Sequence, residues 1–183
     1  MQYELIRSSR RTLAAEIKHG RLIIRAPQLT SKAEIERFIA RHGKWIGTRL
    51  AAAKQQEAMA ASPRLTSEEL QSLADQARKV IPERVRYYAP LVGVTYGRIT
   101  IRCQRSRWGS CSAKGNLNFN CLLMLAPPEV LDSVVVHELC HRKEMNHSAR
   151  FYAEVLRVFP DYRKWTGWLK ENGAALMQRM TGA

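Results

Sequence analysis

Hydrophobic and polar positions suit strands at the start of the chain and change to a helical spacing soon after. Residues 3–26 hold β-rich runs around a His-Gly turn, and Pro27 is expected to end this hairpin. Residues 31–34 have the spacing of a capping box, and the apolar residues beyond them recur with a helical period. The pattern predicts a β-hairpin followed by one long helix, which Gly43 or Gly47 can interrupt.

The periodic pattern is weakest just before Pro63. We place a domain boundary there, between an N-terminal hairpin and helix extension of residues 1–62 and a main domain of residues 63–183. A second capping box at residues 66–69 opens the main domain. It predicts a helix that reaches about residue 88.

Two segments of the main domain have the alternation of strands. Apolar and polar residues alternate in residues 98–103 and again in residues 117–121. The polar stretch between them, residues 104–116, contains two glycines and resembles a long hairpin loop. We therefore expect a small antiparallel sheet.

Helical signals dominate the last third of the chain. Residues 127–129, Pro-Pro-Glu, are typical of a helix start, and this helix should run to about residue 143. Ser148 can cap a further helix to about residue 158, and residues 160–161 precede a last one. Three helices are therefore expected after the sheet.

Length and apolar content limit the compartment and the architecture. The 183 residues allow one substantial core, with or without a small appendage. The apolar runs are far shorter than the roughly 20 residues that span a bilayer, so no membrane association is expected. The N-terminus lacks the apolar block of an export signal, which favours a cytoplasmic protein.

The cysteines are scattered, without a close C-x-x-C pair. This spacing suggests neither a disulfide framework nor a thiolate zinc site, so we expect reduced thiols. The four residues are Cys103, Cys111, Cys121 and Cys140.

The formal net charge of +14 is spread along the chain. A field of this sign attracts anions without specificity. Two explanations of the net charge remain open. The charge can serve solubility and give only loose affinity for nucleic acid, or it can serve to bind a functional anionic partner such as a nucleotide. No recognisable nucleic-acid-binding motif accompanies the charge.

The candidate chemistry begins with the pentapeptide His-Glu-Leu-Cys-His at residues 137–141, an HExxH motif. Two histidines four positions apart lie on one face of a helix, so His137 and His141 can reach the same ion. Glu138 flanks that face and can contact a water molecule at the metal without being a ligand. This is the arrangement of a general base.

A catalytic zinc ion needs a third protein ligand and one open position. His147 is the best candidate, because it lies six positions after His141, where the chain can turn back toward the ion. Glu154 and Asp161 remain alternatives. The competing explanation, ordinary core histidines, is costly because two histidines and Glu138 would be buried together without a metal.

Several short segments together resemble one family. The chain is similar to the YgjP-like metallopeptidases, a family of zincins, and more distantly to SprT-like proteins, with a specific match over about residues 98–170. The matching residues are 107–111 (RWGSC), 125–128 (LAPP), 135–141 (VVHELCH) and 146–151 (NHSARF). The resemblance implies a zincin-type α+β fold with the small sheet on the metal-binding helix, one zinc ion on three histidines, and a glutamate base that matches Glu138.

On this basis we expect a zinc-dependent metallopeptidase that acts on peptides or unfolded proteins. Zinc would activate a water molecule, and Glu138 would accept its proton and pass it to the leaving amine. The backbone of residues 117–122 is the expected edge for an extended peptide.

Five residues near the motif are expected to contact substrate. A cluster of arginines beside a tryptophan can fix a carboxylate, a phosphate or a nucleic-acid backbone, although a solvated loop face explains the same charges. The candidates are Arg105, Arg107, Trp108, Asn118 and Asn120.

Two other functions remain open. The same zinc chemistry on phosphorus would give a nucleoside triphosphate pyrophosphatase or another phosphoester hydrolase. Alternatively, the chain would be a nucleic-acid-associated binding protein with an incidental zinc site, and filter binding with a salt titration tests this.

Overall fold

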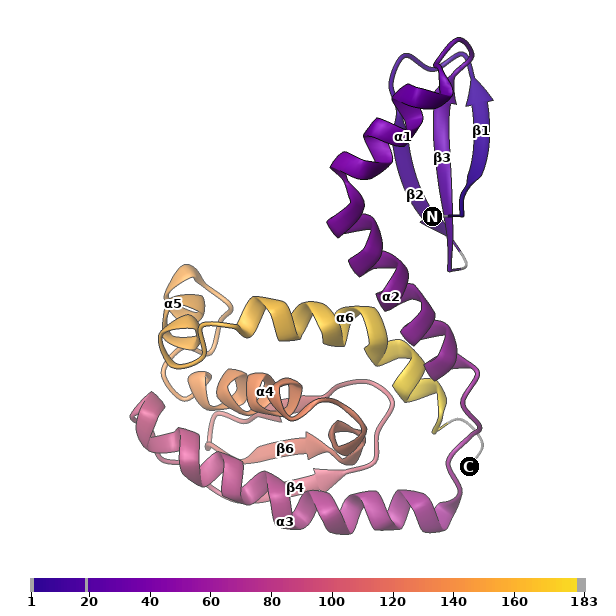
Figure 1. Cartoon of the computed structure of the whole chain (residues 1–183). Helices are drawn as coiled ribbons and strands as arrows, with labels where there is room; N and C mark the ends of the chain where they lie inside the picture. The colour runs from indigo at the N-terminus through magenta and orange to yellow at the C-terminus, as the bar shows by residue number, and fades with distance from the viewer. Residues whose placement is uncertain (1, 19, 181–183) are drawn as a thin grey trace. The chain divides into compact units, whose positions relative to one another are not determined.

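The computed structural model describes residues 2–18 and 20–180, the side chains of residues 55, 56, 59 and 60 excepted. The chain forms two compact units, Met1–Ser62 and Pro63–Ala183 (Figure 1). Helices and small sheets occur in both, so the predicted α+β class is confirmed. In the described residues, no helix combines the length and the apolar character that crossing a membrane needs.

The first unit is a three-stranded sheet followed by two helices. Its elements are β1 (Glu4–Ser8), β2 (Ala14–Lys18), β3 (Arg21–Pro27), α1 (Lys32–Arg41) and α2 (Gly43–Ala60). The predicted hairpin is β2 with β3, and β1 adds a third strand parallel to β3. Ser31 and Glu34 form the expected capping box, and the helical run is interrupted before Gly43.

The second unit contains the helices and strands that surround the HExxH motif. Its elements are α3 (Ser67–Val92), β4 (Ile99–Arg102), β5 (Gly109–Cys111), β6 (Leu117–Asn120), the 3-10 helix η1 (Cys121–Leu125), α4 (Pro128–Cys140), α5 (Ala149–Val158) and α6 (Tyr162–Gln178). The predicted starts of α4, α5 and α6 are confirmed, and Ser148 caps α5 through the amide of Phe151.

The helix α3 is longer than predicted. Its capping box forms as expected, but it passes through Pro82 and Pro90 and ends only at Gly93, in the left-handed conformation with φ 79°. The buried positions continue through Tyr88 to Val92. Burial of this apolar face outweighs the local loss of backbone hydrogen bonds at the two prolines.

The sheet of the second unit is mixed and not antiparallel as predicted. The supposed hairpin loop contains β5, which pairs antiparallel with β6, while β4 pairs with β6 in parallel. Because the chain has already reversed once through β5, β6 runs in the direction of β4 and lies between the two. The strand β6 is therefore the middle strand and offers no free edge.

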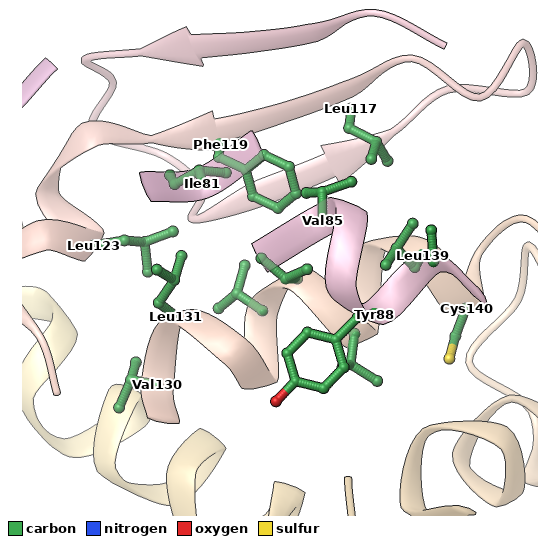
Figure 2. Packing of buried hydrophobic residues seen from close by; sticks show 14 of the residues in the cluster. Ile81, Val85, Tyr88, Leu117, Phe119, Leu123, Val130, Leu131, Leu139 and Cys140 are labelled. Carbon is green, nitrogen blue, oxygen red and sulfur yellow. The ribbon is translucent and has the colours of Figure 1, made fainter. Parts of the chain in front are cut away.

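The core of this unit forms around α4. Buried side chains of α3, α4 and β6 form one cluster, and Figure 2 shows Val85 of α3 between Phe119 of β6 and Leu139 of α4. On α3, Arg84 holds the buried Asp132 of α4 through Nε at 2.6 Å, and the Tyr88 hydroxyl donates to the same carboxylate at 3.1 Å. The helix that carries the motif is thus fixed on several sides.

Candidate metal centre

Three histidine side chains converge at the end of α4. His137 lies in its last turn, His141 is its C-terminal cap, and His147 lies in the short loop before α5. The Nε2 atom of His137 is 3.2 Å from Nε2 of His141 and 2.9 Å from Nε2 of His147. Among the described residues, these three form the one group that could hold a metal ion.

The outer nitrogens of two rings have partners that set their orientation. Nδ1 of His141 is 3.2 Å from the carbonyl oxygen of Glu144. A carbonyl only accepts, so the proton of His141 lies on Nδ1 and leaves a lone pair on Nε2. Nδ1 of His137 is 2.7 Å from the hydroxyl of Tyr162. Such outer contacts are typical of histidines that bind metals.

Burial favours the neutral form of His137 and His141. It lowers the pKa of His137 to about 3, and the pKa of His141 also falls, chiefly through burial. Phe151 of α5 forms an apolar wall, with its ring centroid 4.7–4.9 Å from those of all three histidines. Neutral imidazoles are the form in which histidine binds a metal.

The donor set fits one zinc ion. Bonds of about 2.0–2.1 Å in a tetrahedral arrangement separate neighbouring ligand nitrogens by roughly 3.3 Å. The separations of 3.2 and 2.9 Å around His137 are close to this value. Without a cation, the lone pair of His141 would face a second ring nitrogen across a short distance. A cation at this point satisfies all three rings.

Glu138 lies beside the cluster and is 5% exposed. Burial raises the pKa of its carboxyl group to about 8, an effect that the positive charge of Arg107 opposes. A neighbouring divalent cation favours the ionised form in the same way. In the described part of the chain, no group is seen to donate a hydrogen bond to this carboxylate, which leaves it available to a water molecule or a substrate.

The carboxylate of Glu138 occupies the space beside Gly109 in β5. A methyl group at position 109 would lie 2.6 Å from Oε1 and 2.8 Å from Cγ of Glu138. Real Cβ atoms do not approach other atoms so closely, so β5 comes this near to the carboxylate because residue 109 is glycine.

Replacing Gly109 with alanine is expected to displace the Glu138 carboxylate and lower kcat by about 10-fold to 100-fold, because small misplacement of a reacting group is costly. Zinc content should stay at the wild-type level, since the three atoms nearest to a methyl group at position 109 all belong to Glu138. Gly167→Ala in α6 is the matched control, because its methyl group meets nothing within 4 Å. Equal kcat values for the two variants, measured on the same substrate, would contradict the positioning role.

A cavity of about 210 Å³ opens beside the histidines and Glu138. Its walls come from β5 and the residue before it, from α4 and from α6. The lining residues are Trp108, Gly109, Ser133, Val134, His137, Glu138, Tyr162, Thr166 and Leu169. Most of the surface that these residues expose to the cavity is apolar. The volume of the cavity suits a single side chain of a substrate.

The structure separates the predicted substrate-binding residues. Trp108 lines the cavity, and the charge of Arg107 acts on Glu138. Arg105 instead contacts the carbonyl oxygen of Met180 at 3.3 Å. Asn118 donates to the hydroxyl of Ser110 across the sheet at 3.2 Å. Only Trp108 and Arg107 are thus tied to the site by a described interaction.

Asn120, the last of the predicted substrate-binding residues, lies in the interior of the second unit. This residue is fully buried. Its amide donates to the carbonyl oxygens of Gln104 and Arg107, and its Oδ1 accepts from the amide of Leu122. Asn120 therefore holds the loop before β5 in place through internal hydrogen bonds. A polar residue in an alternating strand pattern fits this structural role as well as it fits substrate binding.

Three contributors to the site were missed by the sequence. Tyr162 orients His137, Phe151 packs against the rings, and Gly109 makes room for Glu138. Phe151 and Gly109 each lie within a segment that resembles the family, at residues 146–151 and 107–111. The sequence therefore offered a signal for both residues. Nothing in the sequence around Tyr162 marks it.

The alternative ligand Glu154 is engaged elsewhere. It accepts from Lys143 at 3.0 Å and from Arg157 at 2.9 Å. Both contacts lower the pKa of its carboxyl group. Asp161, the second alternative, is exposed and precedes α6. Neither belongs to the group of converging ligands in the described residues.

Comparison with known proteins agrees with this chemistry. A family model described as "YgjP-like, metallopeptidase domain" matches residues 11–73 and 61–172. No curated protein matches the chain. Two solved structures are similar to part of it, the metallopeptidase zymogens abylysin of Pyrococcus abyssi and jannalysin of Methanocaldococcus jannaschii. Abylysin is 20% identical over 50% of this chain and 94% of its own, with a TM-score of 0.46, and jannalysin is 21% identical over 51% and 96%, with a TM-score of 0.45.

Proposed function

The chain belongs to the YgjP-like metallopeptidase family, and on this premise we propose that it is a zinc peptidase in which Glu138 is the general base. His137, His141 and His147 hold the ion. The observation that carries the proposal is the convergence of three imidazole nitrogens beside the buried carboxylate of Glu138, to which no described group donates a hydrogen bond. Zinc suits this set, because catalytic zinc ions take three protein ligands and leave one position open.

When bound, zinc supplies Lewis acidity that makes a nearby water molecule more acidic and polarises the scissile carbonyl group. The protein's own part is proton transfer. The carboxylate oxygens of Glu138 accept the proton of the attacking water and return it to the leaving amine nitrogen. Gly109 and the cavity wall hold the carboxylate in place, and Tyr162 holds the ring of His137.

The edge of the sheet supports peptide binding. Because β6 is the middle strand, the predicted edge at residues 117–122 does not exist, and β5 lies at the edge nearest to Glu138. An extended peptide can pair with an edge strand through backbone hydrogen bonds. The cavity beside Trp108 and Leu169 then receives one apolar side chain next to the bond that is cut.

One observation favours a second candidate, hydrolysis of nucleoside triphosphates. Arg107 lies close enough for its positive charge to oppose the rise that burial causes in the pKa of Glu138. An arginine in this position can bind phosphate oxygens as well as a peptide carboxylate. The same histidines and the same base serve either reaction.

The test compares both substrate classes on the zinc-loaded protein. A library of quenched fluorogenic peptides and a denatured protein form one arm, and the common nucleoside triphosphates form the other. We expect cleavage in the peptide arm that a chelator abolishes and added zinc restores. Zinc-dependent release of pyrophosphate or phosphate, with the peptide arm silent, would replace the peptidase by the second candidate.

A further inference from the structure

The thiols of Cys103 and Cys121 lie next to each other, just beyond the C-terminal ends of strands β4 and β6. Their sulfur atoms are 2.7 Å apart. Separate thiols normally keep a greater distance, and a disulfide bond is about 2.05 Å long. Both cysteines are free in the structure.

The register of the sheet explains this proximity. The last pair of the parallel strands β4 and β6 is Arg102 with Asn120. The next residue after each strand is a cysteine, Cys103 after β4 and Cys121 at the start of η1. Neighbouring strands are about 4.8 Å apart, which is within the range of Cα separations that a disulfide bridges.

Hydrogen bonds hold the backbone around the pair. The buried amide of Asn120 donates to the carbonyl oxygen of Gln104 at 2.6 Å and to that of Arg107 at 3.1 Å. Its oxygen accepts from the amide of Leu122. The chain on both sides of the two cysteines is therefore fixed, and little conformational freedom is lost when the sulfurs are joined.

We propose that Cys103 and Cys121 are a modification site, a pair of thiols that a peroxide oxidises reversibly to an intramolecular disulfide. Cys103 is exposed and Cys121 is buried, so the oxidant meets Cys103 first. Burial and the neighbouring thiol raise the pKa of Cys121 to about 12, which agrees with this order.

The reaction balances with hydrogen peroxide as the oxidant. The sulfur of Cys103 attacks one peroxide oxygen, the O–O bond breaks, and a sulfenic acid and one water form. The sulfur of Cys121 then displaces the hydroxyl group, the S–S bond forms, and its thiol proton leaves with that group as a second water. Together the two thiols lose two protons and two electrons, and one peroxide becomes two waters.

The cross-link closes the segment that carries β5. This segment includes Gly109, which lies against Glu138, and Trp108, which lines the cavity. Joining its ends removes conformations from the unfolded chain. The oxidised protein should therefore unfold at a temperature about 5–10 °C higher than the reduced protein.

The experiment treats the purified full-length protein with hydrogen peroxide, blocks the remaining thiols, and maps the products by mass spectrometry. Trypsin alone leaves Cys121 and Cys140 in one fragment, residues 115–142, so a glutamate-specific protease is added to separate them at Glu129 and Glu138. We expect a linked pair of fragments, residues 103–105 with residues 115–129, that dithiothreitol dissolves.

Two variants complete the test. The Cys103→Ser protein should show neither the linked fragments nor the rise in unfolding temperature. The control is Cys111→Ser, which removes a thiol of β5 and should keep both. Four blockable thiols after peroxide treatment would overturn the proposal. So would further oxidation of Cys103 without a link, a link to Cys111 or Cys140, or a disulfide between two molecules.

Discussion

Glu138→Gln is expected to lower kcat by about 10²-fold to 10⁴-fold while the protein keeps its zinc ion. This range is typical of the loss of a general acid or base. Glutamine has nearly the same shape as glutamate but cannot accept the proton of the attacking water. Because Glu138 is buried and its charged form is disfavoured there, a neutral amide fits the same place without loss of stability.

The measurement is kcat on a substrate that the peptide screen identifies, with zinc content and unfolding temperature determined for the same samples. Glu129→Gln is the matched control, since Glu129 is an exposed glutamate in the first turn of the same helix α4. It should leave kcat unchanged. A Glu138→Gln protein that binds zinc and turns over substrate at the wild-type rate would remove Glu138 from the mechanism.

Short-range patterns predicted most of the second unit's helices and the convergence of the three histidines. The histidines are near in sequence, and helical geometry alone brings His137 and His141 to one face. His147 follows within a short loop, so its return toward the other two histidines depends on few backbone angles. The capping boxes at Thr66 and Ser31 were likewise predicted from the sequence and are confirmed, because a capping box is a contact between residues three positions apart.

Contacts between distant segments were beyond the sequence pattern. Tyr162 reaches His137 from another helix, 25 positions away, and Gly109 reaches Glu138 from a strand of three residues. Such a short strand has too few positions to show alternation. Missing β5 also led to the wrong sheet, since the order of strands decides whether β6 is an edge.

Replacing His147 with alanine is expected to remove the zinc ion. The loss should exceed the 10-fold to 100-fold weakening that is typical when only an outer partner of a ligand is removed. His147 is exposed, so the substitution leaves no cavity in the core and the fold should persist. His42→Ala is the control, since His42 is an exposed histidine that contacts Phe38 in the first unit.

The zinc content of these proteins after dialysis tests the metal centre most directly. Wild-type protein and His42→Ala should each hold about one zinc ion per chain, and His147→Ala should hold almost none while its circular dichroism spectrum stays that of the wild type. A wild-type protein that binds no zinc when zinc is supplied, or a His147→Ala protein that retains a full equivalent, would contradict the three-histidine site.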